Sequence, residues 1–372
     1  MKYGIIIAAA GLSSRMRGGF KPLLPLGDKT IIEHVVDHAI EAEISRVVVV
    51  VGKNGDLLRQ KLSERPVTVV ENPDYDTTDM MTSIQLGLRH LPEDLDAFFV
   101  MPVDMPLITA QCYQEMMYCC LDQPPKTIVK AMYGSKGGHP ILLGMDFREE
   151  ILSYKGENGL KGVVSGPGCA VFRVYWKDRS VLMDADTPEE YERMVQFFET
   201  TRAAGQTNPF AILKQNKTPV KVIQHSVAVE QKALQLARKA IAKGYRLDMD
   251  LIHNAALLHD VERTRPKHAE AGARLLEQHG MPEEARIVRE HMFLSEEAVQ
   301  QMAERAIVFL AAKLDCGTKE VTIGKRFEKK LELYRDQPEV YEKICRNMQW
   351  AGQIARNLYD YTPKPPATVE YE

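Results

Sequence analysis

The fold class follows from the stretch KYGIIIAAAG at residues 2–11, a continuous apolar run that ends at a glycine. Such a run is typical of a parallel strand buried on both faces. Helical spacing follows over residues 30–42, and a second buried strand over residues 47–51 completes a βαβ unit. The alternation continues with strands at 67–70 and 97–100 and helices at 82–90 and 110–121. The sequence therefore predicts an α/β fold, a doubly wound and mostly parallel sheet whose ligand crevice lies at the carboxyl ends of its strands.

Length and periodicity indicate a second domain. The chain has 372 residues, against roughly 100 to 200 residues for an average domain. The β pattern stops after Phe198, and residues 200–219 are rich in turn-forming and polar residues, which predicts a linker. Apolar residues then recur with helical spacing, as at Val229, Ala233 and Leu236. We expect an α/β domain at 1–199, a linker at 200–219, an all-α domain at 220–361 and a frayed tail at 362–372.

The composition excludes several classes of protein. A formal net charge of −3 and a hydrophobic content of 45% are ordinary for a globular protein, and no basic patch points to nucleic acid. The apolar runs are far shorter than the roughly 20 residues that span a bilayer, and no signal peptide is evident. The six cysteines show no CxxC or zinc spacing. We expect a cytoplasmic protein with reduced thiols that binds neither membrane nor nucleic acid.

The loop that leaves the first strand carries a phosphate-binding pattern. Residues 8–16 read AAAGLSSRM, and Lys21 follows in FKPL at residues 20–23. Small residues let backbone N–H groups approach phosphates, while Arg15 and Lys21 supply the positive charge that holds a triphosphate. A glycine after a strand is by itself usually only a turn. The combination of turn, arginine and lysine favours nucleotide binding.

This stretch resembles the molybdenum cofactor guanylyl- and cytidylyltransferases, a MobA-like group of NTP transferases. The family motif matches at Ala9, Ala10, Gly11, Ser14, Arg15, Met16 and Lys21. Arg17 stands where the family usually has glycine. The resemblance implies nucleotide-binding roles for Ala9, Ala10, Gly11, Ser14, Arg15 and Lys21. In this family Ala-Ala-Gly accompanies cytidylyl transfer, so CTP is the favoured nucleotide and a molybdopterin-type acceptor is implied.

An aspartate follows the strand expected at residues 97–100. Asp104 lies between Pro102 and Pro106, in the sequence PVDMP. A carboxylate at a strand's carboxyl end beside a triphosphate is well placed to hold Mg²⁺. A turn-capping role is the alternative from the residues alone, but the family's Asp-x-Pro at this place favours metal binding. The resemblance thus makes Asp104, with Arg15 and Lys21, catalytic, and gives Asp104 a nucleotide-binding role as well.

Two further segments fit the resemblance. The stretch MMTSIQLG at residues 80–87 is similar to the family's serine-containing helix start, where Ser83 would meet base or ribose. An ordinary N-cap is an equally good interpretation. Gly138 and His139 resemble the family's Gly-x-Pro element and imply the acceptor side of the site.

The acidic segment DADTPEE at residues 184–190 resembles the family's Asp-x-Asp-Thr-Pro-Glu-Asp element. By this resemblance Asp186 is the candidate for a second Mg²⁺ contact, and Asp184 is its rival. Thr187 and Pro188 also suit a helix start, as N-cap and first helical residue. Both roles are compatible.

A second constellation lies at the end of an apolar helix, in LLHDV at residues 257–261. Adjacent His259 and Asp260 offer nitrogen and oxygen ligands for a divalent metal that activates water. This region resembles the HD phosphohydrolase superfamily over about residues 220–320. The resemblance implies a second divalent metal with the ligands His225, His259, Asp260, His268 and His291.

One departure from the HD pattern concerns the last ligand. The family has aspartate in an Ala-Asp-Lys-Leu segment where this sequence has Ala312, and Asp315 three residues on is the candidate substitute. Three interpretations stay open for this domain: an active hydrolase, a metal-binding but inactive regulatory module, and a purely structural helical domain. The remaining histidines carry no motif, and surface or packing roles are expected for His34, His38, His90, His253 and His279.

The sequence as a whole predicts an enzyme that moves an NMP, with CMP favoured, from an NTP to a phosphate-bearing acceptor and releases pyrophosphate. A molybdoenzyme or a chaperone is the protein partner that this function implies. Two alternatives stay open. One is a sugar- or alcohol-phosphate nucleotidyltransferase, and the other is a nucleotide sensor with an inactive HD module.

Overall fold

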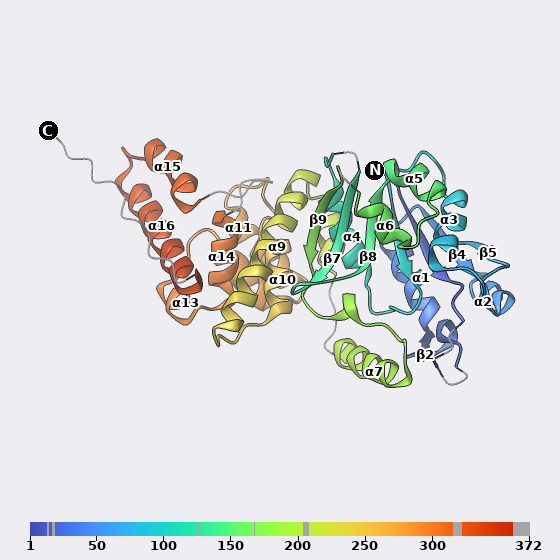
Figure 1. The fold of residues 1–372 in the computed structure, drawn as a ribbon. Helices are drawn as coiled ribbons and strands as arrows, with labels where there is room; N and C mark the ends of the chain where they lie inside the picture. The colour runs from blue at the N-terminus through green and yellow to red at the C-terminus, as the bar shows by residue number, and fades with distance from the viewer. Residues whose placement is uncertain are drawn as a thin grey trace. The chain divides into compact units, whose positions relative to one another are not determined.

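The computed structural model describes residues 1–12, 15–16, 19–124, 126–166, 168–203, 208–314 and 322–359. The chain divides into two compact units, Met1–Phe210 and Ala211–Glu372. Figure 1 shows the strands of the first unit in blue to green and the helices of the second in yellow to red. The division falls inside helix α8 (Pro209–Gln215), within the span expected to be a linker. That span is partly helical because its apolar residues pack: Phe210 and Leu213 are buried.

The first unit is built on a sheet of seven strands in the described residues, in the order β5-β4-β1-β6-β8-β7-β9. Six strands run parallel, and β8 is antiparallel to both of its neighbours. The strands are β1 (Tyr3–Ala9), β4 (Arg46–Val51), β5 (Thr68–Glu71), β6 (Ala97–Pro102), β7 (Thr127–Tyr133), β8 (Lys136–Gly144) and β9 (Ala170–Tyr175). A two-stranded hairpin joins β2 (Pro25–Leu26) to β3 (Lys29–Thr30). The predicted α/β class and mostly parallel sheet are confirmed.

Helices cover both faces of this sheet. They are α1 (Ile31–Glu41), α2 (Gly55–Lys61), α3 (Met80–His90), α4 (Ala110–Cys120), α5 (Arg148–Ser153) and α6 (Gly159–Val164). Helix α7 (Pro188–Ala203) packs outside the sheet, in a small core with Leu26 and Ile31. Along β1, Ile5 and Ile7 belong to the core formed with α1 and α4, whereas Ile6 belongs to the core formed with α3. Full burial of one such side chain contributes about 1.5–3 kcal/mol, so the apolar run is stable only as an inner strand.

One glycine brings α3 unusually close to the sheet. A Cβ added to Gly87 would lie 2.5 Å from Cγ2 of Ile6 and 3.1 Å from Cγ2 of Val50. No larger residue fits without moving the helix away from β1 and β4. Gly87 thus fixes the height of α3 over the sheet, and with it the position of the first turn of α3 beside the end of β1.

The second unit is helical throughout its described residues, as expected. Its helices are α9 (Val220–Ala242), α10 (Met249–Leu258), α11 (His268–Gln278), α12 (Pro282–Glu290), α13 (Glu296–Gln301), α14 (Glu304–Leu314), α15 (Ile323–Leu333) and α16 (Pro338–Tyr359). One apolar core includes Val229, Ala255 and Phe309, from α9, α10 and α14. No described helix is both long and apolar enough to pass through a membrane.

Candidate active sites

The first candidate site lies where the order of the sheet reverses. Strand β1 pairs with β4 on one side and with β6 on the other, both in parallel. The loops that leave β1 and β6 therefore open into the same crevice. A cavity of about 170 Å³ occupies it, lined among others by Ala9, Gly11, Lys21, Ser83 and Asp104. Residues from four separate stretches of the sequence thus meet here.

Lys21 is the centre of the charged residues in this crevice. It lies in a short 3-10 helix, η1 (Lys21–Leu23), with its side chain only 13% exposed. Its Nζ donates to Oδ2 of Asp104 at 3.1 Å and also to Oδ1 of Asp186. Nη1 of Arg15 donates to Oδ2 of Asp186 at 2.6 Å. The structure brings together all four of these residues, although the sequence separates Arg15 from Asp186 by 171 positions.

The acidic segment is tied to Asp104 by the main chain. The N–H of Ala185 donates to the carbonyl oxygen of Asp104 at 3.0 Å. Asp184 and Asp186 are therefore the two residues that flank the donor of this hydrogen bond. Thr187 donates through both N and Oγ1 to Glu190, and Glu190 N donates back to the Thr187 hydroxyl, so the expected N-cap of α7 is confirmed.

The charges in the cluster shift one another's pKa values. Burial alone would lower the pKa of Lys21, but its hydrogen bond to Asp186 and the charge of Asp104 raise it above its usual value. The same hydrogen bond from Lys21 lowers the pKa of Asp186. Burial, followed by the charges of Asp104 and Asp186, raises the pKa of Asp184. Lys21 thus stays charged, and Asp184 loses its proton less readily because of burial and the two neighbouring carboxylates.

Helix α3 begins earlier than the sequence pattern indicated. Asp79 is its N-cap and accepts from the N–H of Thr82 at 3.1 Å, so Ser83 lies in the first turn and is not the cap. Ser83 is buried and still lines the cavity. Asn72, which sequence reasoning missed, donates through Nδ2 to the hydroxyls of Thr78, at 3.0 Å, and Ser83, at 3.4 Å. Its turn-forming surroundings, NPD, were the available signal.

The predicted acceptor residues, Gly138 and His139, lie on β8 and do not line the cavity. A Cβ added to Gly138 would come within 1.8 Å of the carbonyl oxygen of Val181. Gly138 therefore lets β8 pack against the 3-10 helix η3 (Ser180–Leu182), a packing reason for the family's glycine. Burial lowers the pKa of His139, and its Nδ1 is buried without a partner among the described residues. Ser14 lies outside the described residues.

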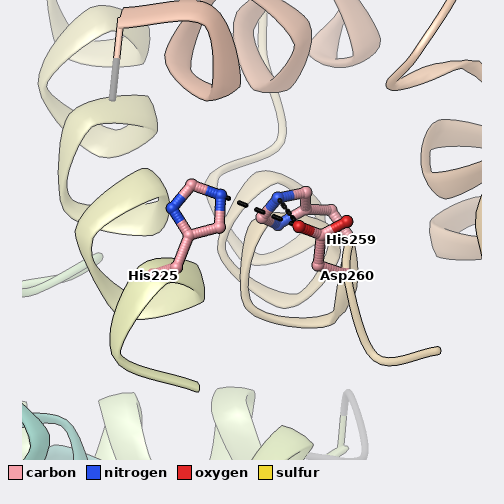
Figure 2. Close-up of side chains that lie close together, drawn as sticks. All are labelled: His225, His259 and Asp260. Carbon is pink, nitrogen blue, oxygen red and sulfur yellow. Dashed lines mark ion pairs between the residues drawn. The ribbon is translucent and has the colours of Figure 1, made fainter. Parts of the chain in front are cut away.

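The second candidate site lies among the helices of the second unit. His225 comes from α9, whereas His259 and Asp260 directly follow α10. Figure 2 shows these three side chains pointing toward one another. His268 is the first residue of α11, and His291 follows α12. All five predicted ligands are therefore close together.

The two carboxylate oxygens of Asp260 divide the four histidines into pairs. Its Oδ2 lies 3.7 Å from Nε2 of His225 and 3.5 Å from Nε2 of His259. Its Oδ1 lies 3.2 Å from Nε2 of His268 and 3.5 Å from Nε2 of His291. Each pair forms with Asp260 a group of three atoms close enough to share a metal ion.

Backbone carbonyls orient two of these imidazoles. His259 contacts the carbonyl oxygen of Ala256 through Nδ1 at 2.7 Å, and His291 contacts that of Val288 through Nδ1 at 2.6 Å. An Nδ1–H that donates to a carbonyl leaves Nε2 with its lone pair facing the cluster, the usual arrangement of metal-binding histidine. Burial lowers the pKa of His291 to about 4, which keeps the imidazole neutral, as metal binding requires. These residues fit a divalent metal.

The sequence predicted that the family's last metal ligand is missing at position 312, with Asp315 as its candidate substitute. Only the first of these two positions lies among the described residues. Ala312 on α14 is buried and offers no ligand atom, while Asp315 lies outside the described residues. Lys313 is buried beside it and donates through Nζ to the carbonyl oxygen of His291 at 3.1 Å. Burial lowers the pKa of Lys313 to about 7. Lys313 matches the lysine of the family's Ala-Asp-Lys-Leu segment, and its hydrogen bond to His291 was not predicted from the sequence.

Arg263 is another residue of this site that was not predicted from the sequence. Its Nη1 lies 3.1 Å from Nε2 of His268 and 3.5 Å from Oδ1 of Asp260. A spacing of three residues from Asp260 was the available signal. By contrast, His253 has a packing role, as expected: it is fully buried, and its Nδ1 contacts Oε1 of Glu230 at 2.8 Å.

Comparison with known proteins finds a different family for each of the two units. Residues 5–173 match the model of the MobA-like NTP transferase domain, and residues 222–346 match that of the HD domain. The uncharacterized protein MJ0778 of Methanocaldococcus jannaschii is 33% identical over 157 residues, which cover 37% of this chain and 91% of that protein.

Two other relatives cover about half of this chain. The bifunctional protein GlmU of Brevibacillus brevis is 25% identical over 206 residues, 51% of this chain. The chain spans only 42% of that protein. A nucleotidyl transferase from Methanothermobacter thermautotroptrophicus has a solved structure with 23% identity and a TM-score of 0.48, covering 54% of this chain and 99% of the other.

Proposed function

The chain belongs to the MobA-like NTP transferase family and joins that domain to an HD domain, and on this basis we propose that its first unit transfers CMP from CTP to molybdopterin. The observation that carries the proposal is the position of Lys21 between Asp104 and Asp186, in a cavity at the ends of β1 and β6. A cation held between carboxylates at such a crevice suits a magnesium-bound triphosphate.

The chemistry needs no covalent intermediate with the protein. A phosphate oxygen of the acceptor attacks the α-phosphorus, the bond from that phosphorus to the bridging oxygen breaks, and pyrophosphate leaves with the negative charge. Lys21 and Arg15 donate to the phosphate oxygens on which that charge develops. The small residues Ala9, Ala10 and Gly11 let the main chain approach the phosphates. Catalysis is then chiefly positioning and electrostatic stabilisation.

The carboxylates are assigned to the metal. Asp104 and Asp186 would hold Mg²⁺, which prefers oxygen ligands and supplies positive charge beside the phosphates when bound. The raised pKa of Asp184, caused by burial and the neighbouring carboxylates, supports a site that gains from a divalent cation. Asp184 is the alternative ligand to Asp186. Ser83, in the first turn of α3, is assigned to the base or ribose.

The preference for CTP rests on the tripeptide Ala9-Ala10-Gly11, and the acceptor rests on the resemblance to molybdenum cofactor enzymes. A sugar- or alcohol-phosphate acceptor is the alternative within the same reaction. A nucleotide sensor that binds NTP without turnover is the alternative of another class.

Pyrophosphate release tests this proposal. Wild type, Asp104→Asn and the control Asp94→Asn are given CTP, GTP, ATP or UTP with Mg²⁺ and freshly released molybdopterin. Asp94 is a suitable control because it is an exposed aspartate paired with Lys2. We expect turnover with CTP in wild type and control, and none in Asp104→Asn. Turnover only with sugar or alcohol phosphates would show that one of these, and not molybdopterin, is the acceptor. Nucleotide binding without turnover would favour the nucleotide sensor.

For the second unit, the pairing of four histidines around Asp260 favours a metal-dependent phosphohydrolase. His225 and His259 would hold one divalent ion with Asp260, and His268 and His291 would hold a second with its other oxygen. Such ions, when bound, lower the pKa of water and polarise a phosphate. Phosphate release from a nucleotide panel with Mn²⁺, Mg²⁺, Co²⁺ or Ni²⁺ tests this, with His259→Gln as the inactive variant. Metal binding without hydrolysis would favour a regulatory module.

A further inference from the structure

A second hollow reaches the carboxylates of the first unit. This groove has a volume of about 460 Å³ and is lined along η3 and α7 by residues that include Arg179, Leu182, Asp184, Arg193 and Phe197. It shares no lining residue with the nucleotide cavity, which holds Lys21 and Asp104. Asp184 connects the two, because the N–H of the next residue, Ala185, donates to the carbonyl oxygen of Asp104 at 3.0 Å. The groove and the cavity therefore approach the same cluster of carboxylates.

Two arginines line the groove, and in the part of the chain that the structure describes neither is held in an ion pair as some other arginines of this unit are. Arg65 is paired with Glu33 and Asp37, and Arg15 is paired with Asp186. Among the described residues, neither Arg179 nor Arg193 has a carboxylate within ion-pair distance. Arg193 uses only Nε, which donates to the carbonyl oxygen of Glu189 at 3.1 Å. Both guanidinium groups are thus available to an anion from outside.

The other lining residues define the shape of what can bind. Glu190 also lines the groove, but its carboxylate accepts from Thr187 at the start of α7. Leu182 and Phe197 are half-buried and face the groove as apolar surface. Leu182 is backed by β8, since a Cβ on Gly138 would lie 3.0 Å from its Cδ2. The lining of the groove thus combines two positive charges with apolar surface and the carboxylate of Asp184.

We propose that this groove binds the acceptor, and that the acceptor carries an anionic group, remote from its reacting oxygen, which Arg179 and Arg193 hold. The inference rests on the proposed transferase function. In-line transfer needs the acceptor at a different site from the departing pyrophosphate. The groove provides one, because it is lined by Asp184 and not by residues of the cavity that holds Lys21. Guanidinium groups match phosphate and carboxylate geometry, so the acceptor is an anion with an apolar or flat body.

Binding of phenyl phosphate tests the groove without requiring the natural acceptor. The full chain is first saturated with Mg²⁺ and α,β-methylene-CTP, which blocks the nucleotide cavity and cannot release pyrophosphate. Phenyl phosphate, inorganic phosphate and phenol are then titrated by calorimetry. The variants are Arg179→Gln/Arg193→Gln and the control Arg46→Gln, an exposed arginine at the opposite, amino-terminal end of β4.

We expect phenyl phosphate to bind wild type and Arg46→Gln with equal affinity. Its affinity for the double variant should be at least tenfold lower. Each protein should bind phenyl phosphate more tightly than phenol. With a turned-over acceptor, the double variant should raise its KM about tenfold and change kcat less than threefold. Equal binding to wild type and the double variant would overturn the inference, as would no binding to wild type. Failure of the transferase proposal shows separately, as absent nucleotide binding or absent pyrophosphate release in wild type.

Discussion

Replacing Lys21 by methionine is the sharpest test of the first site. The substitution keeps the length and most of the volume of the side chain but removes the Nζ atom, which contacts both Asp104 and Asp186. On the proposed function, Nζ stabilises charge on the departing pyrophosphate. Removing one such preorganised donor from a water-poor site typically lowers kcat by about 10²–10³, or about 3–4 kcal/mol. The side chain is 13% exposed, so solvent can replace the lost charge only in part.

The assay is the initial rate of pyrophosphate release against CTP concentration at saturating acceptor. Lys155→Met is a matched control, because Lys155 is an exposed lysine outside the cavity and the groove. We expect kcat/KM of Lys21→Met to fall by about 10²–10³, while the control stays within twofold of wild type. Far-ultraviolet circular dichroism checks that the variant is folded. A folded Lys21→Met with kcat/KM within threefold of wild type would refute the role of Lys21.

Three further predictions concern packing, metal content and pH. Gly138→Ala should lower the free energy of unfolding by about 1–3 kcal/mol in urea, since the added methyl group would meet the carbonyl oxygen of Val181. If it unfolds like wild type, the close packing of β8 on η3 is wrong. His268→Ala should lower the Mn²⁺ content of the chain by about one ion by mass spectrometry, whereas the exposed control His279→Ala should keep the wild-type content. An unchanged content in His268→Ala would contradict two separate metal positions around Asp260. Burial alone would raise the pKa of Glu33, but hydrogen bonds from Thr30 lower it to about 2 from 4.5. The charge of Glu33 therefore stabilises the fold above about pH 4.5, and this contribution is lost as pH falls toward 2. Glu33→Gln should cost about 1 kcal/mol at pH 7 and nothing near pH 2 in thermal unfolding, and a constant difference would contradict this.

The parts of the fold that could be predicted are those encoded by local periodicity. The apolar runs of β1 and β4 and the spacing of α1 give one βαβ unit directly, because a strand buried on both faces has no polar alternation. The strands β7, β8 and β9 were not predicted, and β8 is the antiparallel one. Its place between β6 and β7 depends on long-range pairing, such as Phe99 with Leu142, that no window of sequence contains.

For the candidate sites too, local motifs could be predicted from the sequence but contacts between distant segments could not. Arg15, Lys21, Asp104 and Asp186 were found as separate motifs, and the structure brings them together. The pairing of Lys21 with two carboxylates could not be predicted, because it depends on the distance between segments more than 80 residues apart in sequence, 83 and 165 positions for the two contacts. In the second unit, the division of the histidines by Asp260 required the packing of α9, α11 and α12 around one side chain.

The hydrogen bond from Ala185 N–H to the carbonyl oxygen of Asp104 sets the distance between the two acidic segments through the main chain alone. Side-chain replacements on either segment leave this bond in place. The neighbouring groove is lined by residues of η3 and α7, and their side chains do not take part in this main-chain hydrogen bond. On the proposed role of the groove, replacing Arg179 or Arg193 can change the choice of acceptor while this main-chain bond preserves the spacing of the two acidic segments.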